Sequence, residues 1–211
     1  GDFRRSLDLP TEVTAAARRI RDGQARPFDA GRVRYLGHGG AEETRHFLNV
    51  ASFGFSSAVA TRANASSKRL GGRIAFFAAT VRVLTSYDNT DVWLSLDGAP
   101  RERRRILLAA VGNGRYFGGG MQICPEAKLD DGALDLVTVG DFSRGEVLTK
   151  IGRLYRGTHL ELEEVSSARV TRLVAEPVEA DARIPLELDG ETPGYLPATF
   201  EVLPSALRVR V

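Results

Sequence analysis

The central stretch from Gly112 to Val139, GNGRYFGGGMQICPEAKLDDGALDLVTV, constrains the fold of this chain more than any other segment. It places glycines, an aromatic pair, a proline and an acidic turn between two apolar runs, 106–111 and 133–139. Residues with such special backbone preferences cost conformational free energy unless their geometry is used. We therefore expect a candidate site in this stretch.

The pattern of apolar residues elsewhere predicts a mainly β fold. From residue 90 the apolar period becomes two, as in Val92 and Leu94, and Asp97-Gly98 has the composition of a hairpin turn. Short alternating or β-branched runs, separated by Pro or Gly, predict strands over 101–111, 168–175, 184–188, 198–203 and 207–211. This spacing predicts a two-layer β-sandwich with a few added helices. With 211 residues, of which 43% are hydrophobic, the chain is long enough to bury such a core as one domain.

Four segments have helical patterns: 11–23, 56–68, 73–87 and 143–159. In the last of these, Ser143 and Glu146 have the spacing of a capping box. The segment 73–87 has a wide apolar face that includes Phe76 and Phe77, which leaves both burial on a sheet and contact with an apolar ligand open.

The segment before residue 50 predicts further turns and strands. Phe28 to Gly31 has the composition of a turn, and strands are expected over 33–36 and 45–50.

The composition of the chain limits the classes of partner and the cellular compartment that we expect for it. A net charge of +2 gives no support for nucleic acid as a partner. The single cysteine, Cys124, forms no internal disulfide, so a reducing cytoplasm is expected. No run approaches the roughly 20 apolar residues of a membrane helix, and residues 1–10 do not resemble a signal peptide. Because the chain does not begin with Met, we expect its first residue to be an internal boundary or a processing product.

Familiar catalytic and phosphate-binding motifs are poorly matched. The three histidines, His38, His46 and His159, lack the spacing of a hydrolase or zinc site and are expected at the surface. Gly112-Asn113-Gly114 begins like a dinucleotide-binding motif, but Phe117 stands where the third glycine is needed and a strand follows. These glycines therefore give little support for a nucleotide cradle.

Two acidic turns are more informative. Asp130-Asp131-Gly132 could present oxygen ligands to Mg²⁺ or Ca²⁺, although an ordinary β-turn with the same residues is the commoner explanation. Asp189-Gly190 has the composition of a hairpin turn, and the adjacent Glu191 could take a proton from a substrate hydroxyl. The residues alone leave both alternatives open at each turn.

Taken together, these motifs resemble the soluble bacterial diacylglycerol kinase and lipid kinase family, relatives of the sphingosine kinases. The matching residues extend through nearly the whole chain: 112–121 with Pro125, Ala127, Asp131-Gly132 and Leu134-Asp135, then Asp189-Gly190-Glu191, Asn49-Val50 with Gly54-Phe55, and 200–204. The resemblance implies a two-lobe enzyme, with an α/β nucleotide lobe that carries a Gly-Gly-Asp-Gly-Thr motif and a C-terminal β-sandwich lobe that holds the lipid.

The nucleotide motif of that family has no match in this chain. Gly71-Gly72 is followed by Arg73-Ile74, whereas 1–5 resembles the end of the family's Gly-Asn-Asp-Phe-Ala-Arg segment. The resemblance therefore implies that 1–211 is the C-terminal substrate-binding lobe, with 1–30 as a remnant of the linker from the nucleotide lobe.

The resemblance also implies roles for individual residues. Glu191 takes the place of the family's catalytic base. Asp131, with the main-chain carbonyls of Lys128 and Ala133, takes the place of a structural Mg²⁺ site, while Asp130 falls where the family varies. The implied activity is ATP-dependent phosphorylation of a lipid hydroxyl such as that of diacylglycerol, by a cytoplasmic protein that contacts the membrane surface transiently. The isolated chain is expected to be inactive, and whether the protein forms a homodimer is left open.

Two other functions remain as alternatives. A non-catalytic lipid-binding or regulatory module would use the apolar face at Phe76 and Phe77, with Arg101 and 103–105 on anionic headgroups at about 1 kcal/mol per charge. The same arginines also suit an edge strand protected from aggregation, which we prefer slightly. A kinase of a soluble nucleotide is the third possibility, against which the Asp-Gly-Glu turn argues. The lipid itself is not fixed by the sequence.

Overall fold

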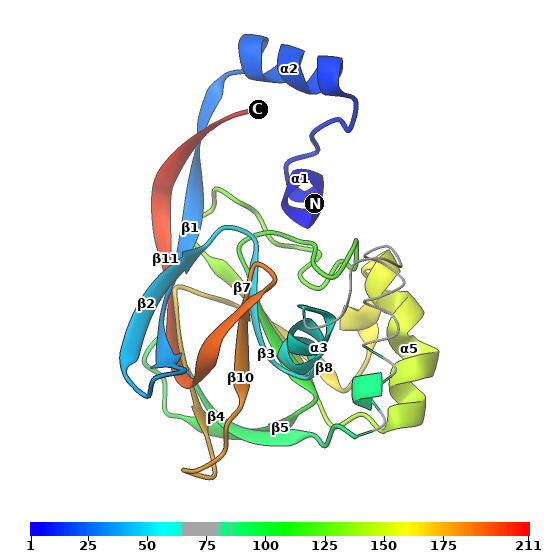
Figure 1. Cartoon of the computed structure of the whole chain (residues 1–211), viewed down its shortest axis with the longest axis vertical. Helices are drawn as coiled ribbons and strands as arrows, with labels where there is room; N and C mark the ends of the chain where they lie inside the picture. The colour runs from blue at the N-terminus through cyan, green and yellow to red at the C-terminus, as the bar shows by residue number, and fades with distance from the viewer. Residues whose placement is uncertain (65–79, 81, 85) are drawn as a thin grey trace.

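The fold is known from a computed structural model, which describes residues 1–64, 80, 82–84 and 86–211. These residues form one eleven-stranded sheet that curls on itself, with a few helices (Figure 1). The mainly β, sandwich-like class predicted from the sequence is confirmed. The strands are β1 (Ala25–Gly37), β2 (Glu42–Phe47), β3 (Val50–Gly54), β4 (Thr90–Leu96), β5 (Glu102–Ile106), β6 (Leu108–Gly112), β7 (Leu134–Val139), β8 (Val165–Val170), β9 (Arg172–Pro177), β10 (Pro185–Leu188) and β11 (Glu191–Arg210).

The order of strands places distant parts of the chain side by side. It runs β5-β4-β9-β11-β10-β3-β6-β7-β8, while β1 pairs with β11 and β2 with β1. Strand β3 is therefore flanked by β10 and β6, so that Ser52 lies opposite Glu187 on one side and Ala110 on the other. This arrangement places the strands next to the two acidic turns in one sheet: β7 follows the Asp131 turn, and β10 and β11 flank the Asp189 turn.

The central strands are buried on both faces. Along β6, Leu108 and Ala110 belong to one apolar cluster, whereas Ala109 and Val111 belong to another. Because successive side chains of a strand point to opposite faces, these two clusters occupy the two sides of the sheet. This double burial explains why β6 and β7 are continuously apolar in sequence.

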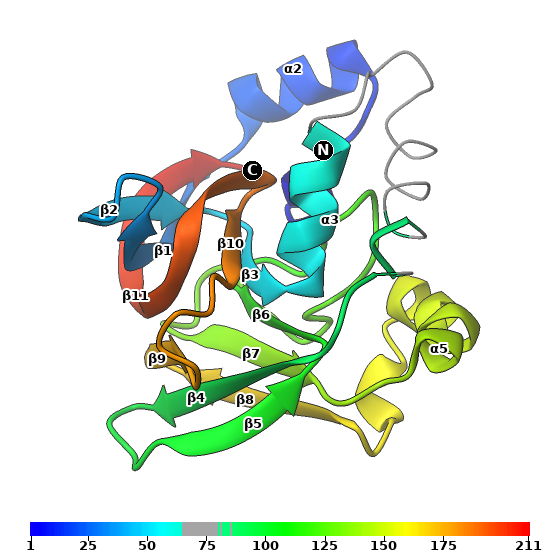
Figure 2. The same ribbon diagram turned by 60° about the horizontal axis from the view of Figure 1, so that its bottom comes forward.

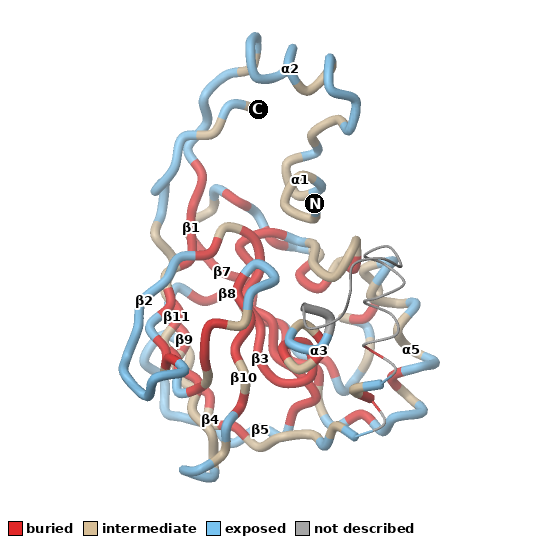
Figure 3. The backbone as a smooth tube through the Cα atoms, in the orientation of Figure 1, coloured by how far each residue is buried: buried red, intermediate tan, exposed pale blue. Residues whose placement is uncertain are grey.

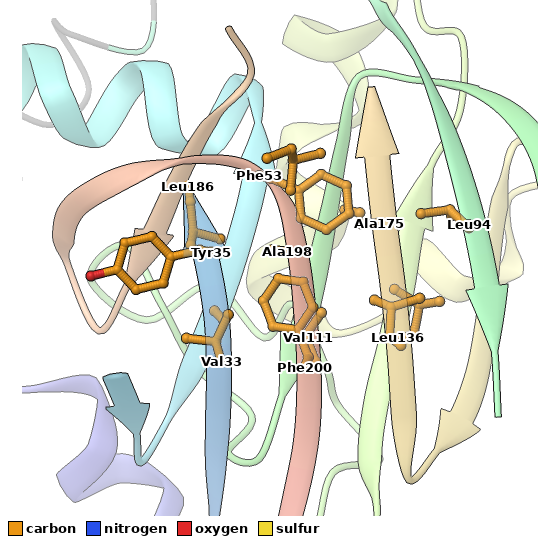
Figure 4. Packing of buried hydrophobic residues seen from close by; sticks show 14 of the residues in the cluster. Val33, Tyr35, Phe53, Leu94, Val111, Leu136, Ala175, Leu186, Ala198 and Phe200 are labelled. Carbon is orange, nitrogen blue, oxygen red and sulfur yellow. The ribbon is translucent and has the colours of Figure 1, made fainter. Parts of the chain in front are cut away.

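The cluster inside the curl is the main core. Side chains from β1, β3, β10 and β11 converge there with others from β4, β6, β7 and β9 (Figure 4). Phe53 and Phe200 stack with ring centroids 6.0 Å apart, and both are fully buried. The cluster on the opposite face lies beneath the helices and is the one that borders the candidate site.

The helices are α1 (Asp2–Ser6), α2 (Val13–Asp22), α3 (Phe55–Asn64) and α5 (Arg144–Arg156), with a 3₁₀ turn η2 (His159–Glu161). The predicted capping box is confirmed: the Ser143 side chain accepts from the Glu146 amide, and the Glu146 carboxylate accepts from the Ser143 amide. Helix α2 is exposed and lies apart from the sheet (Figures 2 and 3). None of the helices in the described ranges combines the length and apolar composition needed to cross a bilayer.

The helix predictions are confirmed to different extents. The predictions for 11–23 and 143–159 correspond to α2 and α5, and the prediction for 56–68 is confirmed as far as Asn64. The prediction for 73–87, with Phe76 and Phe77, lies largely outside the described residues.

Several predicted strand limits were wrong. The expected turn at Phe28 to Gly31 lies inside β1, because this segment pairs with β11 with a shift of register between Phe28 and Ala30. The run 101–111 is two strands that separate at Leu107, since β5 pairs with β4 and β6 pairs with β3. Likewise 168–175 divides at Thr171, and the last two predicted strands belong to one long β11. In each case long-range pairing set the limit.

Candidate functional site

An apolar cavity of about 890 Å³ lies on the helix-covered face of the sheet. Side chains of α3 and α5 form its walls together with residues of β3, β6 and β7. Its apolar lining residues include Phe55, Val59, Leu107, Leu108, Phe117, Val139, Phe142, Val147, Ile151 and Leu154. A cavity of this size and lining is suited to a largely apolar ligand that is held by a few polar groups.

Polar groups of the cavity come from the β10–β11 hairpin and from other elements, which contribute Ser56, Lys150 and His159 among others. Glu187, Asp189 and Gly190 line it, together with Asn49 at the start of β3. The predicted hairpin turn is confirmed, with a positive φ at Asp189 (49°) and Gly190 (96°), as such tight turns require.

The Asp189 side chain fixes this turn to the beginning of β3. Its Oδ2 accepts the Leu48 amide at 2.8 Å, and its Oδ1 accepts the amides of Asn49 and Val50, each at 3.1 Å. Hydrogen bonds to a carboxylate are stronger than those between neutral groups. The carboxylate of Asp189 is therefore engaged in holding the turn.

Glu191, the predicted catalytic base, lies at the first position of β11 next to the cavity lining. Its side chain is 77% exposed and pairs with Arg45 at 3.1 Å. An exposed pair of this kind contributes at most about 1 kcal/mol, so Arg45 is no obstacle to contact between Glu191 and a substrate. Glu191 is thus beside the cavity and open to solvent, whereas Glu187 lies in the wall.

Asp131, the predicted metal ligand, lies in a different place. Its Oδ2 is 2.6 Å from Nη2 of Arg169, and its Oδ1 accepts the Ala133 amide at 3.2 Å. Lys128 lines a second, smaller cavity of about 390 Å³, and neither Lys128, Asp131 nor Ala133 lines the large one. The structure does not bring Asp131 and Glu191 into one site.

A buried aspartate, Asp29, accepts a hydrogen bond from the turn that contains Asp131. Asp29 is 3% exposed; its Oδ2 accepts the Gly132 amide and its Oδ1 the Ser205 amide, both at 2.7 Å. Sequence reasoning missed this residue, because its segment was predicted to be a turn.

The chemistry of the Asp131 turn fits a hard cation. Burial, and after it the negative charge of Asp131, raises the pKa of Asp135 to about 6, while the charges of Arg169 and Lys128 oppose this shift. In the parts of the chain that the structure describes, however, no three His, Cys, Asp or Glu side chains gather as a metal site. Mg²⁺ commonly takes one or two carboxylates, with waters completing its shell. Asp131 and the carbonyls of Lys128 and Ala133 are oxygen donors of the kind that Mg²⁺ takes, and Mg²⁺ held by Asp131 would take the place of its contact with Arg169.

The glycine-rich stretch holds the N-terminal helix α1. The Gly119 amide donates to Oδ2 of Asp2 at 2.7 Å, and the Arg115 amide donates to Oγ of Ser6 at 3.1 Å. A Cβ on Gly114 would lie 2.3 Å from Oδ1 of Asn49, so close packing requires glycine there. The stretch thus shapes one side of the cavity, which Phe117, Gly118 and Gly119 line.

The three histidines have different surroundings. His38 and His46 are exposed as predicted, but the prediction for His159 was wrong. His159 is buried in the cavity wall, where Nε2 lies 3.0 Å from the Ile123 carbonyl oxygen, and burial lowers its pKa. His159 lies in the turn η2 next to α5, and tertiary packing sets this placement.

Comparison with known proteins identifies the family. Residues 49–211 match the family model described as the YegS C-terminal NAD kinase beta sandwich-like domain. The chain is 35% identical over 209 residues to a protein named diacylglycerol kinase from Mycobacterium tuberculosis (strain H37Rv), which covers 99% of this chain and 65% of that protein. It is 32% identical over 212 residues to a protein from Stenotrophomonas maltophilia named "Probable lipid kinase YegS-like", with coverages of 100% and 65%.

A crystal structure supports the fold. A Bacillus anthracis protein proposed to be a diacylglycerol kinase superposes with a TM-score of 0.72 at 24% identity, over 99% of this chain and 64% of that one. The chain therefore belongs to the YegS C-terminal domain family, and it spans about 65% of the length of the curated relatives it matches.

Proposed function

We propose that this chain is the substrate-binding and catalytic lobe of an ATP-dependent lipid kinase, which phosphorylates a lipid hydroxyl such as that of diacylglycerol. One observation carries the proposal: the large apolar cavity ends at the carboxylates of the β10–β11 hairpin. An apolar wall suits acyl chains, and a carboxylate beside it suits the proton of an attacking hydroxyl. The names of the relatives support the same class of reaction.

In this proposal Glu191 accepts the proton of the lipid hydroxyl. The hydroxyl oxygen forms a bond to the γ-phosphorus of ATP, and the bond from that phosphorus to the β-γ bridging oxygen breaks, so that ADP leaves. The nucleotide is held by a lobe outside these 211 residues. Mg²⁺, when bound at Asp131, would neutralise the charge of that turn, and the lipid would enter during transient contact with a membrane surface.

Phosphate transfer by the whole protein tests the role of Glu191. We expect Glu191→Gln to lower kcat for diacylglycerol in mixed micelles about a hundredfold or more, as loss of a general base does. Glu102→Gln, an exposed carboxylate on β5, is the matched control and should leave kcat unchanged. Wild-type turnover by Glu191→Gln would disprove its role, and turnover by the isolated 211 residues would show that no second lobe is needed.

The structure weakens the charge argument for a non-catalytic membrane module. The arginines of β5, and Arg101 just before it, pair with acidic groups: Arg101 with Glu176, Arg103 with Asp91, Arg104 with Glu102 and Arg105 with Asp91 and Asp141. Strand β5 also lies at an end of the strand order, where charged residues discourage pairing with another chain. The apolar cavity wall likewise disfavours a soluble nucleotide as the phosphate acceptor.

A further inference from the structure

Glu187 is a charged residue in an otherwise apolar strand. It lies in β10 between Leu186 and Leu188, which both belong to the core inside the curl. Because side chains alternate along a strand, Glu187 points to the opposite face, where the cavity lies. It is only 6% exposed, and it lines the cavity.

The contacts of Glu187 leave part of its carboxylate available. Oε2 accepts the Ser52 hydroxyl at 2.5 Å, and Oε1 accepts the Gly190 amide. The Ser56 hydroxyl, which also lines the cavity, donates to Ser52 Oγ at 2.9 Å. A carboxylate offers about four acceptor positions, of which these contacts use two. In the part of the chain that the structure describes, the groups that act on Glu187 are Ser52, Gly190 and Asp189, none of which carries a positive charge.

The hydrogen bonds of Glu187 offset the cost of its burial only in part. Those from Ser52 and the Gly190 amide contribute about 1.5–3 kcal/mol each, whereas burying an ionised group without a cation costs several kcal/mol. Burial accordingly raises the pKa of Glu187 to about 7, which leaves it mainly ionised in mildly alkaline solution. A buried carboxylate that lines a cavity and has no cationic partner among the described residues is the kind of feature that marks a binding or catalytic group.

The headgroup must satisfy two carboxylates at different depths. Glu191 lies at the exposed side of the hairpin and Glu187 in the wall. One hydroxyl has one proton, so it cannot donate to both at once. A headgroup that reaches both therefore needs a second donor.

We propose that Glu187, with Ser56 beside it, is the headgroup site of the cavity and binds a second hydroxyl of an uncharged lipid headgroup, distinct from the hydroxyl that is phosphorylated. The ligand class is an acyl lipid with at least two headgroup hydroxyls, as in a monoacylglycerol. The inference rests on the proposed function and narrows the substrate class of the same cavity, because diacylglycerol, which has a single free hydroxyl, would bind more weakly than a lipid with two. It makes Glu187 a specificity-determining residue and leaves proton acceptance to Glu191.

The test compares two lipids that differ by one hydroxyl. The whole protein is assayed at pH 8.5 with 1-lauroylglycerol and with the mono-lauroyl ester of 1,3-propanediol, which keeps the terminal hydroxyl but lacks the second one. Binding without ATP gives Kd, and turnover with ATP gives kcat and KM. A hydrogen bond to a charged acceptor corresponds to about a tenfold preference for 1-lauroylglycerol in wild type. We expect this preference in Kd and KM, with little change in kcat.

The variants identify the residue responsible. Glu187→Gln should reduce the preference to about threefold or less, because a neutral acceptor binds more weakly. Ser56→Ala, which leaves Glu187 in place, should reduce it partly, and Glu102→Gln should retain it. A folded Glu187→Gln protein, or Ser56→Ala protein if the former does not fold, that keeps the wild-type preference would overturn the proposal. So would a wild-type protein that binds both lipids equally.

The outcomes also separate this inference from the proposed kinase. Selective binding of 1-lauroylglycerol without phosphorylation would leave the headgroup site standing and refute the kinase. Phosphorylation of both lipids with equal KM would refute the headgroup site alone. If neither lipid binds, both proposals fail.

Discussion

Replacing Glu187 with Gln should change how the stability of the protein depends on pH. Burial raises the pKa of this carboxyl, and the nearby charge of Asp189 adds to that effect, while hydrogen bonds from Ser52 and Gly190 oppose it. In the folded protein its pKa is about 7, against an ordinary value of 4.5. A carboxyl whose pKa is higher in the folded state stabilises the fold most at low pH, and this stabilisation is lost as the pH rises through about 7.

The magnitude follows from the two pKa values. The interval from pH 4.5 to 7 corresponds to about 3 kcal/mol at about 1.4 kcal/mol per pH unit. Gln does not titrate and can still hydrogen-bond to Ser52 or to the Gly190 amide. We therefore expect the free energy of unfolding of Glu187→Gln, relative to wild type, to rise by about 3 kcal/mol between pH 4.5 and pH 8.5. Near pH 4 the two proteins should differ by no more than about 1 kcal/mol.

Urea unfolding measured through Trp93, the single tryptophan of the chain, gives this free energy at each pH. Glu102→Gln is the control, and its curve should run parallel to that of wild type because its carboxylate is exposed. A difference between Glu187→Gln and wild type that stays constant within about 1 kcal/mol across this range would refute the reasoning. It would mean that Glu187 ionises as if it were in water.

Three further substitutions test the supports of the site. Asp189→Ala removes three hydrogen bonds to backbone amides and should lower the free energy of unfolding in urea by about 3 kcal/mol. Gly114→Ala places a methyl group against Asn49 and should lower that energy by about 1–3 kcal/mol, and limited proteolysis should then cleave the N-terminal segment faster than in wild type. Ser143→Ala removes the N-cap of α5 and should lower the free energy of thermal unfolding by about 1 kcal/mol. The fluorescence of Trp93 in the folded protein, measured without urea, should not change.

Features of the fold that depend on local chemistry could be predicted from the sequence. The hairpin turns at Asp97-Gly98 and Asp189-Gly190 and the capping box at Ser143 are fixed by residues close to one another, and each is present as expected. The breaks at Leu107 and Thr171 could not be predicted, because the chain changes its pairing partner there. At Thr171 the break is held by Asp97, which accepts hydrogen bonds from the Thr171 amide and hydroxyl across 74 residues of sequence.

The residues of the candidate site also include some that the sequence could reveal and some that it could not. The Asp-Gly-Glu turn was found because its composition and its family resemblance coincide at Glu191. Glu187 was missed because a charged residue between two core leucines ordinarily faces solvent. Its burial depends on α3 and on the cavity wall, which no alternation pattern in β10 can show. Asp29 was missed because its partners, Gly132 and Ser205, are contributed by other parts of the chain.

Three carboxylates at alternate positions of one hairpin have three different surroundings, and the roles proposed for them rest on this difference. Glu187 is buried and has acceptor positions left for the cavity. The Asp189 carboxylate accepts hydrogen bonds from three amides. Glu191 is exposed and forms a weak ion pair with Arg45. The exposed Glu191 suits the proposed role of proton acceptor, because that group must meet a hydroxyl that a nucleotide from outside this chain also approaches. Glu187 and Asp189 both line the cavity, but the acceptor positions of Glu187 that its structural contacts leave available suit the proposed selection of the lipid headgroup. Because Asp189 fixes the turn between Glu187 and Glu191, the hairpin holds these two carboxylates at a constant separation, which the proposed division into lipid selection and proton transfer requires.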